Sequence, residues 1–322
     1  MVSKILVLAG GGGHTSIAVA VAQSLHGKVD INSLVPKKDL LSERLLRKYG
    51  EVSNVIKPRG PFTPNYLFVI RFFLSFIQSF TKVDTSYNLV VSSGSNFCIA
   101  PSIVAWLKKI PVINVESRVA LIKPSKTAKI LQKISIVTIL QWEEQKKNLK
   151  GIVVGPIFQK PEYQSSKKGY ILVTGGTEGY RRLFNVFLES DFENIVLQTG
   201  KIESKQYKRK HPSWRVFNFS EDFQSILAGA DIVITHQGGG TIFESVMYEK
   251  PLIIVFNPEL KRTAKFEEIK ILSEKIGASL ITEVSLQKIK DEIYDVKYNF
   301  FPINYNGNIN LRKIILKILD VI

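Results

Sequence analysis

Three segments of the chain share a pattern in which a short apolar strand runs straight into a glycine-rich turn and a helix follows. They are KILVLAGGGGH at residues 4–14, ILVTGGTEG at 171–179 and IVITHQGGGT at 232–241. Free amide groups and the positive end of a helix dipole make such a turn suited to an anion, and glycine lets a phosphate approach the backbone closely. The pattern therefore constrains the chain to an α/β fold with sites for a phosphate-bearing ligand.

Strand-like and helix-like runs alternate along the whole sequence, as is typical of parallel α/β folding. A stretch without periodicity at residues 154–169, where prolines, serines and lysines gather, separates two such series. We therefore expect two doubly wound, Rossmann-like domains at residues 1–156 and 157–322, which face a central cleft, with a C-terminal helix that can pack back on the first. The expected strands span residues 5–9, 29–34, 52–56, 88–92, 112–115 and 134–140, then 170–173, 194–198, 214–217, 232–235 and 252–255.

The chain of 322 residues has 44 Lys and Arg against 28 Asp and Glu, a formal net charge of +16. Such an excess predicts an anionic partner: nucleic acid, anionic lipid or a phosphorylated substrate. Nucleic acid is disfavoured, because no known binding motif is present and the aromatic residues gather on one helix instead of alternating with basic ones. A single cysteine, Cys98, and an amino terminus too short in apolar residues for a signal peptide predict a cytoplasmic protein.

The longest apolar run, YLFVIRFFLSFIQSF at residues 66–80, is shorter than the ~20 residues that cross a bilayer, and Arg71 interrupts it. Helical spacing gathers its polar residues into one narrow stripe and leaves a wide face rich in phenylalanine. Two interpretations stay open, a helix of the core and a helix that lies on a membrane surface. In the second case the residues at the membrane are expected to be Phe68, Arg71, Phe72, Phe73 and Phe76.

The first glycine turn, Gly10 to Gly13, is followed by His14 at the start of a helix. A dinucleotide site is disfavoured, because Thr15 stands where a third glycine is needed and no acidic residue ends the next strand. The helix dipole favours the neutral form of an imidazole at this position, and a neutral imidazole can accept a proton. A histidine that only caps the helix or packs in the turn is the alternative.

A glutamate follows another apolar strand, in the stretch PVINVESRV at residues 111–119. Glu116 should emerge at the same carboxyl edge of the sheet as His14, and two titratable groups at one edge are a candidate acid/base pair. A structural role, in which Glu116 caps a helix and pairs with Arg118, is the alternative.

The stretch after the strand at residues 232–235 combines a histidine, three glycines and a glutamate. Glycine amides and the hydroxyl of Thr241 can bind a diphosphate, and Glu244, about one helical turn later, can accept hydrogen bonds from a vicinal diol such as ribose. The stretch therefore predicts a nucleoside diphosphate site. A tight turn without a ligand is the alternative.

These motifs resemble those of the MurG-like inverting glycosyltransferases of the GT-B fold. The likeness is greatest to the eukaryotic two-subunit enzyme that adds the second sugar to dolichyl-diphosphate-linked N-acetylglucosamine, here with both halves fused in one chain of archaeal or bacterial type. The resemblance implies catalytic roles for His14 and Glu116. It implies acceptor contacts for Gly12, Gly13, Thr15, Ser117 and Arg118. It implies contacts with the donor UDP-GlcNAc for Gly175, Gly176, Thr177, His236, Gly238, Gly239, Gly240, Thr241 and Glu244.

The activity that the resemblance implies is an inverting transfer of GlcNAc from UDP-GlcNAc to a polyprenyl- or dolichyl-diphosphate-linked GlcNAc, an early step of lipid-linked oligosaccharide assembly for N-glycosylation. No cofactor and no metal ion are expected, since no Asp-x-Asp motif stands near the glycine turns and their amides can stabilise the departing diphosphate. We prefer His14 as the base, with Glu116 orienting the acceptor sugar or the imidazole. The reverse assignment stays open.

Two departures from the family leave the donor sugar and the membrane attachment open. The family has a His-Gln pair after the last expected strand, whereas this chain reads NPELKRTAKFEEIKIL, in which Lys265, Glu267 and Glu268 are candidate replacements. The eukaryotic acceptor subunit has an amino-terminal membrane helix that this sequence lacks. We therefore expect peripheral attachment to an anionic surface on the cytoplasmic face of the membrane, through the phenylalanine-rich helix and basic segments such as Lys57–Arg59.

Other functions stay open beside this one. They are a UDP-sugar glycosyltransferase that acts on a glycolipid or a peptidoglycan precursor, a UDP-GlcNAc epimerase, and a UDP-sugar-binding protein without catalysis. The last has no use for His14 and Glu116. An epimerase has no use for an apolar helix that faces lipid.

Overall fold

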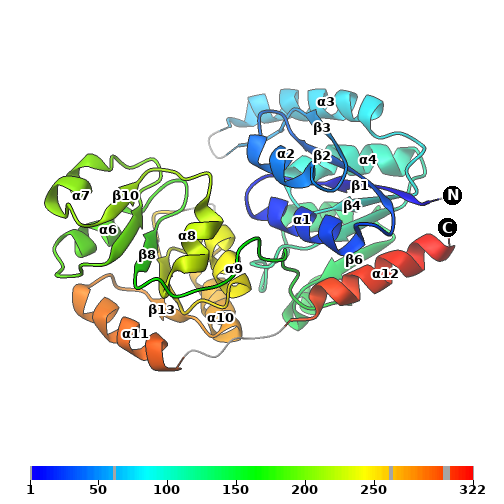
Figure 1. Cartoon of the computed structure of the whole chain (residues 1–322). Helices are drawn as coiled ribbons and strands as arrows, with labels where there is room; N and C mark the ends of the chain where they lie inside the picture. Colours follow the sequence, from blue (N-terminus) through cyan, green and yellow to red (C-terminus); the bar gives the residue numbers. More distant parts are fainter. Residues whose placement is uncertain (1, 61–62, 261–263, 300–304, 322) are drawn as a thin grey trace. The chain divides into compact units, whose positions relative to one another are not determined.

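The structure, a computed structural model, describes residues 2–60, 63–260, 264–299 and 305–321 of the chain. It contains two compact units. The first unit comprises Met1–Lys160 and Tyr305–Ile322, and the second unit comprises Pro161–Asn304 (Figure 1). The division falls four residues after the expected boundary between residues 156 and 157, and the last segment of the chain counts with the first unit.

A seven-stranded parallel sheet in the order β3-β2-β1-β4-β5-β6-β7 forms the first unit. The interior strand β1 reads KILVL, and the last four of these residues are buried, as expected for a strand with helices on both faces. The strands are β1 (Lys4–Leu8), β2 (Asp30–Pro36), β3 (Glu51–Val55), β4 (Leu89–Ser92), β5 (Val112–Val115), β6 (Val137–Leu140) and β7 (Ile152–Val153). The helices are α1 (Gly13–Leu25), α2 (Leu40–Leu46), α3 (Asn65–Lys82), η1 (Asn96–Cys98), α4 (Ile99–Leu107), α5 (Lys126–Leu131), η2 (Glu143–Lys147) and α12 (Gly307–Val321).

Helices cover both faces of this sheet. On one face α1 packs against α12, and Ile17, Val21 and Leu311 belong to one cluster of core residues (Figure 1). On the other face α4 and the inner side of α3 close a second cluster, which contains Phe97 and Val104. The apolar residues at helical spacing after the first glycine turn thus form the buried side of α1.

The second unit is built on a six-stranded parallel sheet in the order β10-β9-β8-β11-β12-β13. The edge strands β7 and β13, of two and three residues, were not expected from the sequence. The strands are β8 (Ile171–Thr174), β9 (Ile195–Gln198), β10 (Arg215–Phe217), β11 (Ile232–Thr235), β12 (Leu252–Val255) and β13 (Ser279–Ile281). The helices are α6 (Arg181–Leu188), α7 (Lys205–Lys210), α8 (Phe223–Gly229), α9 (Gly239–Met247), α10 (Phe266–Ile276) and α11 (Leu286–Asn299).

The strand orders place the glycine turns where parallel sheets bind ligands. In the first sheet the chain reverses its direction of winding between β1 and β4, and in the second between β8 and β11. Crevices at the carboxyl ends of such strand pairs are the usual ligand sites of doubly wound sheets. The three glycine turns of the sequence follow β1, β8 and β11, so each unit has its turns at this position.

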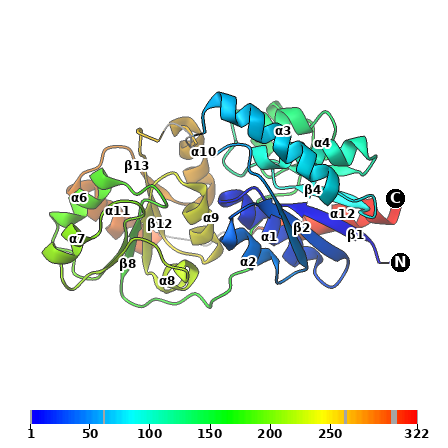
Figure 2. The same cartoon turned by 90° about the horizontal axis from the view of Figure 1, so that it is seen from above.

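Helix α3 buries polar residues and exposes apolar ones, the reverse of a core helix. Two residues of its polar stripe, Ser75 and Ser79, are buried against the first unit, and the Gln78 side chain accepts a hydrogen bond from the Ile56 amide at 2.9 Å. Large apolar side chains point outward instead, and Phe73 is 63% exposed. The helix lies along the outside of the unit beside α4 (Figure 2). The interpretation of this segment as a core helix with a buried apolar face is therefore wrong.

The structure also revises which residues of α3 face outward. Arg71 and Phe73 are exposed, whereas Phe68 and Phe72 are half-buried. Phe76 packs against the core cluster beneath the helix, so its expected place on the outer surface is wrong. No helix in the described ranges is long and apolar enough to cross a bilayer. The exposed apolar residues, here called the α3 outer face, are Tyr66, Val69, Ile70, Phe73, Leu74, Ile77 and Phe80.

Candidate functional site

The first glycine turn links β1 to α1 and has room for no side chain at its start. A Cβ on Gly10 would lie 1.7 Å from the Ser95 hydroxyl oxygen. Gly11 and Gly12 have φ angles of 82° and 60°, a region in which side chains are strained. Gly12 is the N-cap of α1, no described side chain caps the helix there, and no described atom lies within 4 Å of the place its Cβ would take. The turn is therefore open to an anion at the start of α1.

A second turn, Ser93–Ser95 after β4, packs against the first and was missed in the sequence. Gly94 at its centre has a φ angle of 88°, and a Cβ on it would lie 2.4 Å from the Val115 carbonyl oxygen. The signal was the stretch SSGS after a buried strand, in which a single glycine is easily passed over. The two turns pack together beside His14.

His14 is the second residue of α1 and is partly exposed. Its Nδ1 lies 2.8 Å from the Ser93 carbonyl oxygen, and because a carbonyl can only accept, Nδ1 carries the proton and Nε2 has the lone pair. Burial lowers the pKa of His14 below its ordinary value of 6.5, the contact with Ser93 opposes this, and the charges of Lys57 and Arg118 lower the pKa further. The ring is therefore neutral at pH 7 and can accept a proton on Nε2.

Two charged residues flank the same turn. A Cβ on Gly11 would lie 2.9 Å from Asp39 Oδ2, at the N-cap of α2, and 3.0 Å from the ammonium of Lys57, in the segment after β3. The sequence predicts Lys57 only as part of a basic segment. Its place beside Gly11 puts a positive charge at a turn suited to phosphate.

Glu116 is fully buried at the end of β5. Its Oε1 accepts a hydrogen bond from the Ser117 amide at 2.6 Å, and its Oε2 accepts one from the Ser125 amide at 3.0 Å. Both oxygens thus close the loop that follows β5 and none is presented at the surface. This geometry does not fit Glu116 as a group that touches the acceptor, and it favours His14 as the base.

Of the residues expected to bind the acceptor, Gly12, Gly13 and Ser117 are at least partly exposed. Thr15 is buried, and its hydroxyl shares a hydrogen bond of 2.5 Å with the Ser42 hydroxyl. The Thr15 side chain is therefore turned toward α2, and the expected acceptor contact is wrong because the hydroxyl is enclosed.

Arg118 is also turned inward, with only 3% of its surface exposed. Its guanidinium donates hydrogen bonds to the carbonyls of Ile157 at 3.0 Å and Gly13 at 3.4 Å, and to the Ser16 hydroxyl. It also lies over the ring of Phe158, 5.5 Å from the centroid. These contacts leave the guanidinium enclosed by protein, so the expected contact with the acceptor is wrong.

In the second unit, α9 begins at Gly239 with its first amides uncapped. Gly238 is the N-cap, and no described side chain caps the helix there. Gly240 is exposed, and no described atom lies within 4 Å of the place its Cβ would take. Thr241 in the first turn and Glu244 one turn later are partly exposed. The first amides and the helix dipole are thus arranged to meet an anion, with a carboxylate within reach of a second group on the same ligand.

His236 joins the turn after β8 to the turn after β11. Its Nε2 lies 2.9 Å from the place of a Cβ on Gly176 and 2.8 Å from that of a Cβ on Gly238, so the ring needs glycine on both sides. Gly175 is equally constrained, since its Cβ would meet backbone atoms at 2.3 Å. Thr177 is exposed at the tip of the turn. The structure therefore brings two separate groups of expected donor residues together around one imidazole.

The imidazole of His236 is 8% exposed, and its burial lowers the pKa to about 4, so the ring is neutral at pH 7. Its Nδ1 is buried and has no hydrogen-bond partner among the described residues. A buried polar atom without a partner costs about 1–3 kcal/mol, which a ligand or a water molecule recovers when it supplies the partner.

Gln237, which belongs to none of the predicted sites, fixes the segment after β12 to this turn. The Gln237 side chain donates to the Asn257 carbonyl at 2.6 Å and accepts from the Asn257 amide at 2.8 Å. The side-chain amide of Gln237 thus pairs with the backbone of Asn257 through two hydrogen bonds, as neighbouring β-strands do. It fixes the start of the segment in which the family has its His-Gln pair.

The candidate replacements for that pair lie at the start of α10. Lys265 is the N-cap, and its amide donates to Glu268 Oε2 at 3.2 Å, so Glu268 is engaged in capping the helix. Glu267 is exposed. Residues 261–263 lie outside the described residues. No described group of three or more His, Cys, Asp or Glu side chains is placed to hold a metal ion.

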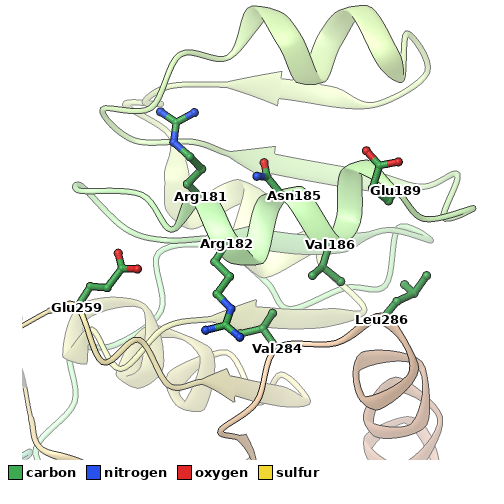
Figure 3. Close-up of a pocket in the computed structure, with 8 residues that line it drawn as sticks. All are labelled: Arg181, Arg182, Asn185, Val186, Glu189, Glu259, Val284 and Leu286. Carbon is green, nitrogen blue, oxygen red and sulfur yellow. The ribbon is translucent and has the colours of Figure 1, made fainter.

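A separate hollow of about 670 Å³ opens on the second unit between α6 and the segment from β13 to α11 (Figure 3). Two arginines stand at the end of α6 nearest Glu259, and apolar side chains line the part toward α11. None of its residues is an expected donor residue, so the hollow is distinct from the glycine turns. It is lined by Arg181, Arg182, Asn185, Val186, Glu189, Glu259, Val284 and Leu286.

Comparison with known sequences gives matches at two scales. Residues 170–299, which contain both glycine turns of the second unit, match the family model described as glycosyltransferase family 28 C-terminal domain. The chain is 28% identical over 318 residues, 89% of its length and 84% of the relative's, to a Prochlorococcus marinus (strain MIT 9515) protein. That protein is named UDP-N-acetylglucosamine--N-acetylmuramyl-(pentapeptide) pyrophosphoryl-undecaprenol N-acetylglucosamine transferase.

Solved structures share the fold over almost the whole chain. MurG of Acinetobacter baumannii superposes with a TM-score of 0.64 at 17% identity, covering 98% of this chain and 99% of that one. UDP-GlcNAc 2-epimerase from Neisseria meningitidis, bound to UDP-GlcNAc, gives 0.68 at 15% identity, covering 99% and 100%. At these identities the likeness concerns the fold alone, which is GT-B. The chain is MurG-like in sequence and fold.

Proposed function

We propose that this MurG-like chain is a glycosyltransferase that moves GlcNAc from UDP-GlcNAc to a polyprenyl-diphosphate-linked sugar without a metal ion. The observation that carries the proposal is the junction in the second unit where His236 packs between Gly176 and Gly238 beside the uncapped start of α9. The uncapped amides at a helix start, beside a turn that only glycine can form, suit the diphosphate of a nucleotide sugar. The match of residues 170–299 to a glycosyltransferase domain supports the same assignment.

In the proposed donor complex the diphosphate lies at the start of α9, against the amides of Gly239, Gly240 and Thr241. The same amides and the helix dipole then stabilise the negative charge that grows on UDP as it leaves. Glu244, one turn later, accepts hydrogen bonds from the ribose hydroxyls. The family's His-Gln pair is absent here, so it gives no support for GlcNAc as the sugar. The support comes from the names of the relatives.

On the first unit we assign His14 as the base. Nε2 takes the proton of the acceptor hydroxyl as the hydroxyl oxygen forms its bond to the anomeric carbon, and the bond from that carbon to UDP breaks. The Nδ1–H contact with Ser93 holds the ring in the tautomer this step needs and stabilises the imidazolium that forms. Lys57, beside Gly11, supplies a positive charge for the diphosphate of the acceptor.

Two acceptors fit this scheme. The relatives are named for a substrate in which N-acetylmuramyl-(pentapeptide) is joined to undecaprenol through pyrophosphate, which makes a peptidoglycan precursor the better supported of the two. Dolichyl-diphosphate-linked GlcNAc, for N-glycosylation, is the second, and it rests on the motifs around His14 and Glu116 alone. Both acceptors combine an anionic diphosphate with a lipid tail that lies in a membrane.

Two features of the first unit support peripheral attachment to the cytoplasmic face of an anionic membrane. The α3 outer face exposes seven large apolar side chains on one helix, a pattern that suits the headgroup region of a bilayer. The first unit also holds 25 of the 44 Lys and Arg residues but only nine of the 28 Asp and Glu residues, so the entire formal net charge of +16 falls on it. Such a charge attracts anionic lipid.

The test is an incubation of the purified protein with labelled UDP-GlcNAc and, in parallel, each of the two lipid acceptors. We expect one GlcNAc to be added to a lipid acceptor, in the presence of EDTA as in its absence, and no reaction of the donor alone. Other UDP-sugars in parallel reactions define the donor. Conversion of UDP-GlcNAc to its epimer without acceptor points to an epimerase instead. Transfer that a chelator abolishes contradicts the metal-independent mechanism, and no transfer to either lipid contradicts the proposal.

A further inference from the structure

We propose that Arg118 is a positioning residue that fixes the peptide leading into His14 and holds a positive charge beside the imidazole. The proposal rests on the proposed function, in which His14 is the base. Neither the relatives' names nor the motif that contains Arg118 assigns it this role. Its inward direction in the structure is what suggests it.

One end of the contact network fixes the backbone of the glycine turn. Arg118 Nη2 donates to the Gly13 carbonyl at 3.4 Å and to the Ser16 hydroxyl, and that hydroxyl donates to the same Gly13 carbonyl at 2.9 Å. The Gly13 carbonyl belongs to the peptide group that leads into His14. Arg118 and Ser16 therefore fix the plane of this peptide, while the Ser93 carbonyl fixes the ring.

The other contacts fix the arginine itself. Nη1 donates to the Ile157 carbonyl at 3.0 Å, and the guanidinium lies over the ring of Phe158. The backbone carbonyl of Arg118 accepts a hydrogen bond from the Trp142 indole at 2.7 Å. A planar guanidinium with several donors and a ring beneath it is held in one orientation, which lysine cannot reproduce. The charge of Arg118 is therefore at a fixed place relative to His14.

The charge matters because it acts on the protonation of the base. Arg118 and Lys57 are the cations that face His14, Asp39 flanks the turn at Gly11, and the Glu116 carboxylate is turned to its own loop. Both cations disfavour the imidazolium and lower the pKa of His14, in addition to burial. Removing the charge of Arg118 should therefore raise the pKa of His14. As the pH is lowered, the imidazole is then protonated, and turnover is lost, at a higher pH than in wild type.

The experiment compares Arg118→Gln, which removes the charge, with Arg118→Lys, which keeps the charge but loses the geometry. The pKa of His14 is read by NMR from protein labelled at its four histidines, with His14→Asn to assign the resonance. We expect a raised pKa in Arg118→Gln and little change in Arg118→Lys. We expect kcat to fall about 100-fold in both variants, because the base is displaced, with the KM for UDP-GlcNAc unchanged. Arg209→Gln, on exposed α7, is the matched control and should change neither.

A folded Arg118→Gln protein with the wild-type pKa of His14 and the wild-type kcat overturns the proposal. The NMR readout needs no turnover, so a shifted pKa in a protein without transferase activity rejects the proposed function and leaves the role of Arg118 intact. If Arg118→Gln does not fold, Ser16→Ala and Arg118→Lys replace it, since each removes a contact to the Gly13 peptide. Unchanged kcat in both of these also overturns the proposal.

Discussion

The two units share one architecture and differ in what their surfaces carry. Each is a parallel doubly wound sheet with glycine turns at the strands where the winding reverses. The first unit holds the whole net charge of +16 and exposes an apolar helix face, whereas the second has 19 Lys and Arg and 19 Asp and Glu and is neutral. Under the proposed function, the difference teaches how one scaffold is adapted to two substrates, a lipid-bound acceptor on one unit and a soluble nucleotide on the other.

Their two histidines differ in the same way. His14 is partly exposed, and its Nδ1 is fixed by Ser93, which leaves Nε2 to accept a proton. His236 is packed between glycines, and its Nδ1 is without a partner among the described residues. Burial lowers the pKa of both rings. The proposed function gives the first neutral imidazole a role in proton transfer and the second a role in binding.

The largest expected effect separates these roles. His14→Ala should lower kcat about 100- to 10,000-fold, as the loss of a general base does, while UDP binding measured by calorimetry stays at the wild-type level. His26→Ala, in the same unit and edge-on to Tyr49, is the control and should retain activity. If turnover and UDP binding fell together, the division between the units would not hold.

The next effect concerns the stability of the second unit and its dependence on pH. His236 has a pKa of about 4 when folded and 6.5 when unfolded, so the unfolded chain takes up a proton first as the pH falls. The contribution of the neutral ring is present above pH 6.5 and is lost progressively toward pH 4, by up to about 3 kcal/mol. Urea unfolding at a series of pH values should show this loss in wild type and in His211→Asn, and a smaller loss in His236→Asn, in which His14 still has a lowered pKa. A loss of the wild-type size in His236→Asn would assign it to another group.

A smaller effect tests the donor site. Glu244→Gln should weaken UDP binding about 10- to 100-fold, because a hydrogen bond to a charged acceptor contributes about 1.5–3 kcal/mol. The value of kcat at saturating donor should change little, since the ribose lies far from the bond that breaks. Glu249→Gln, just beyond the same helix and exposed, provides the comparison. If Glu244→Gln and Glu249→Gln bound UDP with equal affinity, Glu244 would not be part of the donor site.

The smallest expected effect tests the α3 outer face with a matched pair. Phe73→Ser should weaken binding to anionic vesicles by about 1–2 kcal/mol and leave the free energy of unfolding unchanged, because this ring is 63% exposed. Phe76→Ser should do the reverse and lower stability by a similar amount, since Phe76 packs against the core. Cosedimentation should also weaken as salt is raised. Vesicle binding that ignores both Phe73→Ser and salt would count against membrane docking by this unit.

The positions of the glycine turns could be predicted because the signal is local. A buried strand, glycines and a helix follow one another within about a dozen residues, so the places of Gly12, His14, Gly240 and Glu244 at the starts of two helices were predicted from spacing alone. The short strands β7 and β13 give no such signal, and the turn at Gly94 has a single glycine. Local patterns therefore identified the strand ends but not every turn that meets there.

Side-chain direction at those strand ends could not be predicted. Glu116 and Arg118 lie at the expected edge. Arg118, however, binds the Gly13 carbonyl, 105 residues away in the chain. Glu116 binds the Ser125 amide, in a loop whose path the sequence does not reveal. Thr15 lies next to His14, but its hydroxyl is taken up by Ser42 on another helix. Whether a polar group at a site faces a ligand or the protein depends on such long-range partners.

By itself the sequence determined the two parallel sheets, the strands that end in phosphate-suited turns, and the excess of positive charge. Apolar runs, glycine spacing and composition fix these, because each depends on neighbours along the chain. The tertiary structure alone decided that α3 buries two serines and exposes the apolar residues of its outer face, that Glu116 and Arg118 hold the backbone around them, and that His236 joins two turns. These depend on which surface a residue meets after packing, and that is set by contacts between segments far apart in the chain.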